Sequence, residues 1–138
     1  MKNPEKAYEK LIKKCKICYI SYVDENGYPV TKAMLKPRGI EGKNTFYFST
    51  NTSSNKVKCF LCNPKASVYF VNTKLYRGLS LCGTAEVLET DEIKKRFWHL
   101  GDRMYYRGGV TDPDYCILKF TAEKGRYYSN FKNSDFEI

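Results

Sequence analysis

Residues 77–89, RGLSLCGTAEVLE, alternate apolar or small side chains with polar ones along their whole length. In an extended chain every second residue points to the same side, so one face would carry Leu79, Leu81, Gly83, Ala85 and Val87. A period-two pattern of this length is typical of a curved strand in a β-barrel, and Gly83 predicts a bend within it. This stretch therefore predicts a mainly β fold built around one long strand.

The stretches on either side predict the other elements of the fold. They are a helix at 3–15, two strands flanking Asn26-Gly27, a strand at 44–50, a short helix at 53–63, a strand at 65–72, a helix beginning at Thr90 and a final strand at 115–121. Short antiparallel connections favour a closed or half-closed antiparallel barrel with helices outside it. We therefore expect one α+β domain over residues 1–138, mainly β with flanking helices, and a polar tail at 129–138 that extends over the surface.

Capping signals and apolar spacing predict the helix after the long strand. Thr90 is a favourable N-cap residue, and Asp91 and Glu92 complement the helix dipole in the first turn. Its buried stripe is expected at Ile93, Phe97, Leu100 and Met104. The first helix is expected to begin at Asn3-Pro4, where a cap residue precedes a first-turn proline.

Composition restricts the kinds of partner that this chain would bind. It has 24 Lys and Arg against 15 Asp and Glu, a formal net charge of +9, so its surface favours anions. The basic residues are spread along the chain, which indicates a generally basic surface rather than a nucleic-acid patch. No apolar run approaches the ~20 residues of a membrane span, and the N-terminus has no apolar leader core. We therefore expect a cytoplasmic protein with no membrane partner, whose six cysteines are not disulfide-bonded.

The stretch FYFSTNTSSNKV, residues 46–57, has the composition of a phosphate site. A strand ends at Ser49-Thr50, a polar loop follows, and a helix begins near Asn55-Lys56, where backbone N–H groups and the helix dipole attract anions. The same residues also admit a simpler interpretation, in which Ser53 or Ser54 is only an N-cap and Lys56 is a solvated first-turn residue. This stretch alone does not decide between the two.

The preceding strand strengthens the phosphate interpretation. Lys32 shares one face with Met34, and we expect its ammonium group to converge with that of Lys56 on one phosphate. The backbone of residues 33–35 would then meet a planar ligand. This arrangement predicts a flavin mononucleotide (FMN) site without a glycine-rich fingerprint.

Five stretches in this order resemble the pyridoxamine 5′-phosphate oxidase-like, FMN-binding split-barrel family, and most of all its small general-stress-protein branch. They are YISYVDENGYPVTKAM, FYFSTNTSSNKV, NPKASVYFV, GTAEVLE and GGVTDPDYCILKFT, and together they span nearly the whole chain. The resemblance implies an antiparallel split barrel, FMN as cofactor and an oxidoreductase activity on an unknown small molecule. In the oxidases the C-terminal region carries an arginine–histidine substrate motif, which GRYYSNFKNSDFEI lacks, so we do not expect pyridoxamine phosphate oxidation itself.

The resemblance also implies the cofactor-binding residues. They are Lys32, Ala33, Met34, Ser49, Thr50, Ser54, Asn55 and Lys56, with Asn55 at a position where the oxidases often carry arginine. Members of this family are homodimers with the flavin at the subunit interface, so the second protomer would line the pocket, with Trp98, Tyr105 and the Gly108-Gly109 loop as candidates. The flavin would carry the redox chemistry, and we name no catalytic residue.

Other interpretations remain open from the sequence. One is a non-catalytic barrel that binds flavin, haem or single-stranded nucleic acid, although we do not favour nucleic acid. Another is deazaflavin use or nitroimidazole reduction. Cys15-x-x-Cys18 and Cys59-x-x-Cys62 could supply four zinc ligands, but their wide separation favours buried small hydrophobic residues, and we expect no metal. His99, the only histidine, is expected to be structural and partly buried.

Overall fold

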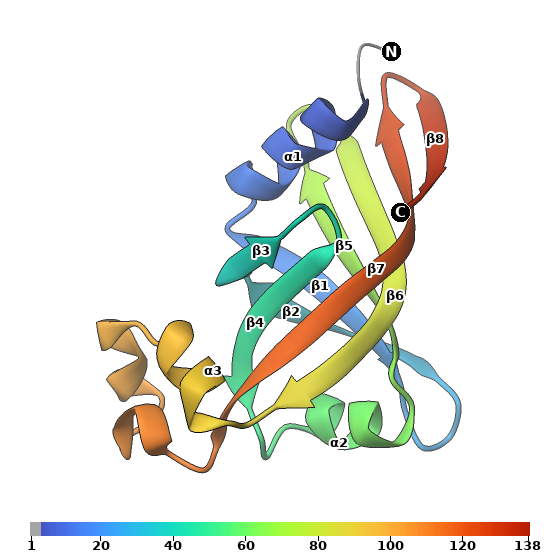
Figure 1. The fold of residues 1–138 in the computed structure, drawn as a ribbon. Coiled ribbons are helices and arrows are strands. Elements are labelled where there is room, and N and C mark those ends of the chain that lie inside the picture. Colours follow the sequence, from blue (N-terminus) through green and yellow to red (C-terminus); the bar gives the residue numbers. More distant parts are fainter. Residues whose placement is uncertain (1–3) are drawn as a thin grey trace.

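The computed structural model describes residues 4–138 and contains an antiparallel sheet of eight strands. The strands are β1 (Ile17–Val23), β2 (Pro29–Leu35), β3 (Gly39–Glu41), β4 (Thr45–Asn51), β5 (Lys65–Asn72), β6 (Arg77–Leu88), β7 (Tyr115–Ser129) and β8 (Lys132–Glu137). The order is β2-β1-β5-β6-β7-β4-β3, and β8 pairs with the far end of β7. In the part of the chain that the structure describes, β2 and β3 end this order and do not pair with each other, so the curved sheet is an open barrel (Figure 1).

Helices cover the two ends of the barrel and one side of it. They are α1 (Pro4–Lys14), α2 (Asn55–Cys62) and α3 (Asp91–Arg96), followed by two 3₁₀ helices at Leu100–Met104 and Gly109–Thr111. Figure 1 shows α1 and α2 at opposite ends of the barrel, with α3 and the 3₁₀ helices to one side. None of the described helices is long and apolar enough to cross a membrane.

The long strand predicted at residues 77–89 is present in the structure. The strand β6 runs over residues 77–88 and pairs with β5 on one side and β7 on the other. Its register with β7 shifts between Cys82 and Gly83, which confirms the predicted bend. A Cβ atom at Gly83 would collide with the backbone carbonyl of Thr121, so only glycine allows the two strands to approach so closely.

Two clusters of buried side chains form the core. The larger one fills the barrel and includes Ile20, Phe48, Val68 and Leu81. The smaller one lies under the segment at 97–115, which we call the lobe, and consists of Tyr47, Phe97, Tyr106, Tyr115 and Ile117. Adjacent residues of β4 and β7 alternate between the two clusters, so both faces of these strands are buried and the lobe is held against the barrel.

The β1–β2 hairpin predicted from Asn26-Gly27 is confirmed. Gly27 has a φ of 82°, and the Asp24 carboxylate accepts hydrogen bonds of 2.9 Å from the backbone N–H groups of Asn26 and Tyr28. The strands pair from Val23 opposite Pro29 onward. The predicted helix at 3–15 matches α1, although its proposed cap at Asn3 lies outside the described residues.

The helix predicted from Thr90 to Met104 is wrong beyond its second turn. Thr90 does cap α3, accepting from the N–H of Ile93, but α3 ends at Arg96. The first 3₁₀ helix begins after His99, whose backbone N–H donates to the Asp102 carboxylate at 2.8 Å. Because of this break, Leu100 and Met104 do not continue the buried stripe and are 91% and 84% exposed.

The C-terminal tail lies largely exposed at the surface, as its polarity predicted, but it forms a paired strand that was not predicted. Residues 132–137 form β8, which pairs with β7 across a turn at Asn130 and Phe131, both with positive φ. Phe136 stacks on Tyr8 of α1 at a ring-centroid distance of 5.2 Å. The backbone pairing with β7 and the stacking of Phe136 on Tyr8 together hold this polar segment in place as a strand. The three-residue strand β3 was also not predicted.

Candidate functional site

The turn between β4 and α2 is held in place by Asp114, at the end of the lobe. The Asp114 carboxylate accepts from the backbone N–H of Ser53 at 2.8 Å and from Asn51 Nδ2 at 3.1 Å, and its backbone carbonyl accepts from the N–H of Thr52 at 2.7 Å. Hydrogen bonds from the side chain and backbone of Ser53 lower the pKa of Asp114. No local pattern in the sequence singles out Asp114, although it lies within the stretch GGVTDPDYCILKFT.

The start of α2 presents backbone N–H groups without a side-chain cap. Ser54 is the N-cap residue, but its hydroxyl donates to the carbonyl of Asn51 at 2.7 Å and makes no capping hydrogen bond. The first N–H groups of a helix have no partner within the helix itself. Ser54 is therefore the N-cap residue, as the simpler interpretation has it, but its side chain does not cap the helix, and the helix start keeps its affinity for an anion.

Lys56 lies in the first turn of α2 and is only 8% exposed. Burial lowers the pKa of its ammonium group, and repulsion from Lys32 lowers it further. Neither lysine forms a salt bridge with any residue that the structure describes. The two ammonium groups are thus close enough to repel each other, and Lys56 is buried without a compensating carboxylate among the described residues, whereas Lys32 is exposed.

The strand β2 places its predicted site residues on two faces. Lys32 is opposite Ile20 and Met34 is opposite Cys18, on the side of the sheet that faces the barrel interior. Ala33 is opposite Tyr19 on the outer, exposed side. The predicted alternation along this strand is therefore correct.

The two hydroxyl residues of β4 do not face the same way. Thr50 is buried and pairs with Cys116, whose thiol interacts electrostatically with Lys56. Ser49 pairs with Ile117, a member of the smaller cluster under the lobe. Because neighbouring residues of a strand point to opposite faces, only Thr50 shares a side with Lys56.

The side chain of Asn55 is hydrogen-bonded to Tyr22, which was not among the predicted site residues. Its Nδ2 atom donates to the hydroxyl of Tyr22 at 3.3 Å, which links α2 to β1. The Tyr22 ring packs edge-on against Phe60 of α2, with ring centroids 5.9 Å apart. Tyr22 shares the buried face of β1 with Cys18 and Ile20, an alternation that predicts burial but gives no sign of a contact with the α2 start.

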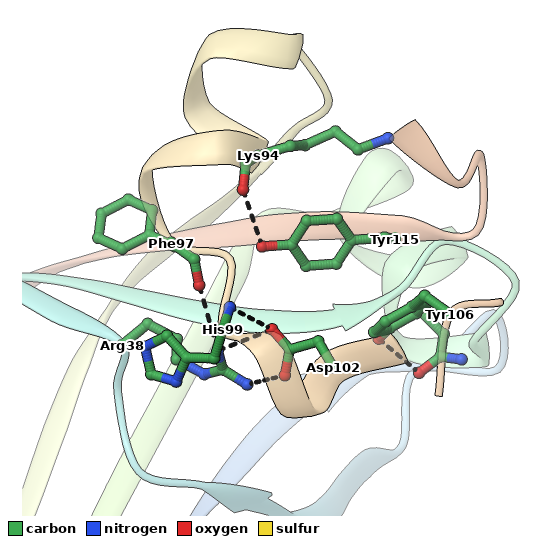
Figure 2. A network of polar contacts seen from close by, with 8 residues as sticks. Arg38, Lys94, Phe97, His99, Asp102, Tyr106 and Tyr115 are labelled. Atoms are coloured by element: carbon green, nitrogen blue, oxygen red, sulfur yellow. Dashed lines mark hydrogen bonds and ion pairs between the residues drawn. The ribbon is translucent and has the colours of Figure 1, made fainter. Parts of the chain in front are cut away.

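A network of polar contacts fixes the lobe to the barrel (Figure 2). The guanidinium group of Arg38, just after β2, donates to both carboxylate oxygens of Asp102, at 2.7 and 2.9 Å, and to the carbonyl of Phe97 at 3.1 Å. The N–H of His99 also donates to Asp102. Burial opposes ionisation of Asp102, but the hydrogen bonds from Arg38 and His99 outweigh it and lower its pKa.

The lobe also reaches the turn at the start of α2. The hydroxyl of Tyr106 donates to Asn51 Oδ1 at 3.2 Å, and burial raises the pKa of that hydroxyl.

Among the candidates for second-protomer contacts, Trp98 is half-buried against Tyr115, Tyr105 is exposed, and Gly109 is buried with a φ of 78°. His99 is exposed, so the expectation of a partly buried histidine is wrong.

All six cysteines are free thiols. Cys15, Cys18 and Cys59 are buried, as expected for small hydrophobic residues, whereas Cys62 is exposed and does not fit that expectation. Burial is the main reason that the pKa of Cys18 is raised to about 12. Across residues 4–138, no three side chains of His, Cys, Asp or Glu are grouped as metal ligands.

Comparison with known proteins establishes the family. The family model described as pyridoxamine 5′-phosphate oxidase matches residues 4–129. The chain belongs to this family. Pyridoxine/pyridoxamine 5′-phosphate oxidases from Shewanella strains are 35% identical over 78 residues, which is 56% of this chain and 36% of the oxidase. The matched stretch thus spans about a third of the length of those members of the family.

Solved structures give the same family and fold. A Clostridium acetobutylicum protein related to general stress protein 26, of the pyridoxinephosphate oxidase family, is 40% identical with a TM-score of 0.88 and covers 97% of this chain and 94% of its own. A pyridoxamine 5′-phosphate oxidase-related, FMN binding protein from Nostoc punctiforme shares the fold at 12% identity (TM-score 0.69; 100% and 98% covered). A heme binding protein from Mycobacterium smegmatis does so at 15% (TM-score 0.79; 99% and 59% covered). The predicted split barrel is confirmed.

Proposed function

We propose that this protein binds FMN and acts as an oxidoreductase on a small molecule. The observation that carries the proposal is Lys56, a buried ammonium group beside Lys32 with no salt-bridge partner among the described residues. Such a pair suits a doubly charged phosphate, because each charge-assisted hydrogen bond contributes about 1.5–3 kcal/mol. The membership of the pyridoxamine 5′-phosphate oxidase family supports FMN as the molecule that carries this phosphate.

The residues at the α2 start fit the phosphate in different ways. Lys32 and Lys56 would supply charge, and the backbone N–H groups at the start of α2 would supply directed donors. Thr50, on the same side as Lys56, would donate its hydroxyl. Asn55 already donates to Tyr22, so its role would be to orient the helix start.

The flavin ring would lie along β2, against the backbone of Ala33 and Met34. When bound, FMN supplies hydride or electron transfer, and the protein supplies position and electrostatic surroundings. Ser49 and Ser54 would contribute less than predicted, because Ser49 faces the lobe and Ser54 is bonded to Asn51.

We also propose that the protein acts as a homodimer with FMN at the subunit interface. The outer face of β1, β2 and β5 supports this, because Ile17, Tyr19, Leu35 and Tyr69 are neighbours across these strands and are 39–57% exposed. A contiguous apolar patch on a sheet is a typical interaction surface. The second copy would cover it and bring its own lobe toward the flavin. Free thiols throughout the chain support a reducing, cytoplasmic location.

The test of the proposal is an FMN titration followed by flavin fluorescence. Saturable binding at micromolar or tighter concentrations is expected. Lys56→Ala should weaken it about 10- to 150-fold, the equivalent of a lost charge-assisted bond. Lys58→Ala, an exposed lysine on the same helix, is the matched control and should change affinity little. Equal effects of the two substitutions would refute the assignment of Lys56.

Haem is the second candidate ligand, because the heme binding protein from M. smegmatis shares this fold. The single histidine, His99, is exposed on the lobe, so it would be the expected axial ligand. Absorbance titrations with FMN and with hemin distinguish the two. A Soret band that His99→Ala abolishes, with no response to FMN, would favour haem.

A further inference from the structure

A basic cavity lies between α1 and the β5–β6 hairpin. Its volume is about 240 Å³, and it shares no lining residue with the turn between β4 and α2. Figure 1 shows α1 beside the ends of β5 and β6, at the opposite end of the barrel from α2. The cavity carries four cations, Lys6, Lys10, Lys14 and Arg77, and none of the described residues that line it is acidic.

The three lysines form one stripe along α1. They are spaced four residues apart, which places them on the same side of the helix. Like charges at this spacing repel one another and destabilise a helix, so the stripe lowers the stability of α1 when no anion is bound. Glu9 and Lys13 line a different hollow, on the other side of α1, so the Glu9 carboxylate does not face the cavity.

Arg77 is the cation on the sheet side of the cavity. Its Nε atom is buried and has no hydrogen-bond partner, which holds for no other side-chain nitrogen or oxygen among the described residues. A buried N–H group of a guanidinium cation normally bonds to an acceptor, because leaving it unpaired is unfavourable. The Nε atom has almost no accessible surface, so it lies beside the cavity, while other atoms of Arg77 line this cavity with the three lysines and also line a neighbouring hollow.

Asn72 adds a further donor to the cavity. It lies opposite Arg77 in the β5–β6 pairing, and its Oδ1 atom already accepts from the backbone N–H groups of Lys74 and Leu75. Its Nδ2 group therefore remains as a donor. A cavity that combines cationic and amide donors, with no carboxylate, is complementary to an anion that has several acceptor oxygens.

We propose that this cavity binds the phosphate groups of a small phosphorylated molecule, such as a phosphate monoester or a diphosphate. Four cations around one cavity match two or more negative charges, and Arg77 supplies a fork that fits phosphate oxygens. The volume of about 240 Å³ is small for a ligand site, so it suits a phosphate group and a short attachment rather than a polymer. This site is separate from the proposed FMN site and does not depend on it.

The test uses inorganic pyrophosphate as the probe and the full chain as the protein. Isothermal titration calorimetry is performed with the Lys56→Ala variant, in which binding at the turn before α2 is weakened. Saturable one-site binding is expected, with a shift of the Arg77 Nε–H resonance in ¹H–¹⁵N spectra. Because this resonance belongs to a residue that lines the cavity and not the α2 turn, its response is independent of whether FMN binds.

Two substitutions at the cavity and one control locate the site. Lys10→Ala and Arg77→Lys should each weaken pyrophosphate binding about 10-fold, since each removes a charge-assisted contact. Lys13→Ala removes the same charge from the other side of α1 and should leave binding within about twofold. If Arg77→Lys does not fold, Lys10→Ala and Lys13→Ala still form a matched pair, because both lysines are exposed.

Three results would overturn the proposal. The first is the absence of saturable binding at millimolar pyrophosphate. The second is an equal loss in Lys10→Ala and Lys13→Ala, which would indicate only general attraction to a basic surface. The third is binding of a single-stranded oligonucleotide through Lys10 and Arg77 that pyrophosphate does not displace, which would assign the cavity to nucleic acid instead.

Discussion

Replacing Lys56 by methionine should stabilise the protein without FMN and weaken FMN binding at the same time. Lys56 is 8% exposed, is repelled by Lys32 and has no salt bridge with a described residue. Methionine keeps the length and the apolar stem of lysine but removes the ammonium group. An uncompensated buried polar group costs about 1–3 kcal/mol, so the expected gain in the free energy of unfolding is about 1–2 kcal/mol.

The gain is measured by urea and thermal unfolding of the two FMN-free proteins. For a chain of this size, 1–2 kcal/mol corresponds to a rise of about 3–8 °C in Tm. Lys58→Met, on the exposed side of the same helix, is the control and should change stability by less than about 0.5 kcal/mol. FMN affinity of Lys56→Met should fall about 10- to 150-fold, so the stability advantage should disappear in excess FMN.

The pH dependence of this gain has a definite sign. The pKa of Lys56 in the folded state lies below its ordinary value of 10.5, so the unfolded state binds more protons in the interval between the two values. The wild-type free energy of unfolding should therefore rise, relative to Lys56→Met, as the pH increases through that interval. Lower stability of Lys56→Met at neutral pH, with Lys58→Met unchanged, would refute the reasoning, because it would mean that the ammonium group has a stabilising partner.

Two further predictions concern the outer face and the lobe. Tyr69→Glu should convert the proposed dimer to a monomer in analytical ultracentrifugation, whereas Tyr28→Glu, an exposed tyrosine in the β1–β2 turn, should not; a dimer in both cases would place the interface elsewhere. Asp102→Asn should destabilise the protein by about 3–5 kcal/mol, because it leaves Arg38 without its buried carboxylate. Wild-type stability from this pair should be lost as the pH falls through the lowered pKa of Asp102, and an unchanged acid-unfolding midpoint in the variant would contradict this.

Much of the fold followed from local patterns along the chain. The period-two alternation in residues 77–89 predicted β6, and Gly83 predicted the bend. Both predictions were possible because successive side chains of a strand point to opposite faces, so the buried face can be recognised from the residues of the strand itself. The cap at Thr90 was correct for the same reason, since a cap depends on a few consecutive residues. Leu100 and Met104 were misplaced because the helix break at His99 depends on Asp102 and its partner Arg38, which is distant in sequence.

The sequence by itself determined the strand alternation, the hairpin, the helix starts and the positions of Lys32 and Lys56, because these depend on side-chain type and spacing within short segments. Only the tertiary structure decided that Lys56 is buried, that Ser49 and Thr50 face different clusters, that Asp114 holds the α2 turn, and that Arg77 has an unpaired Nε atom beside three lysines of α1. The physical reason is that burial and hydrogen-bond partnership are properties of which segments pack together, and those segments are separated by many residues along the chain.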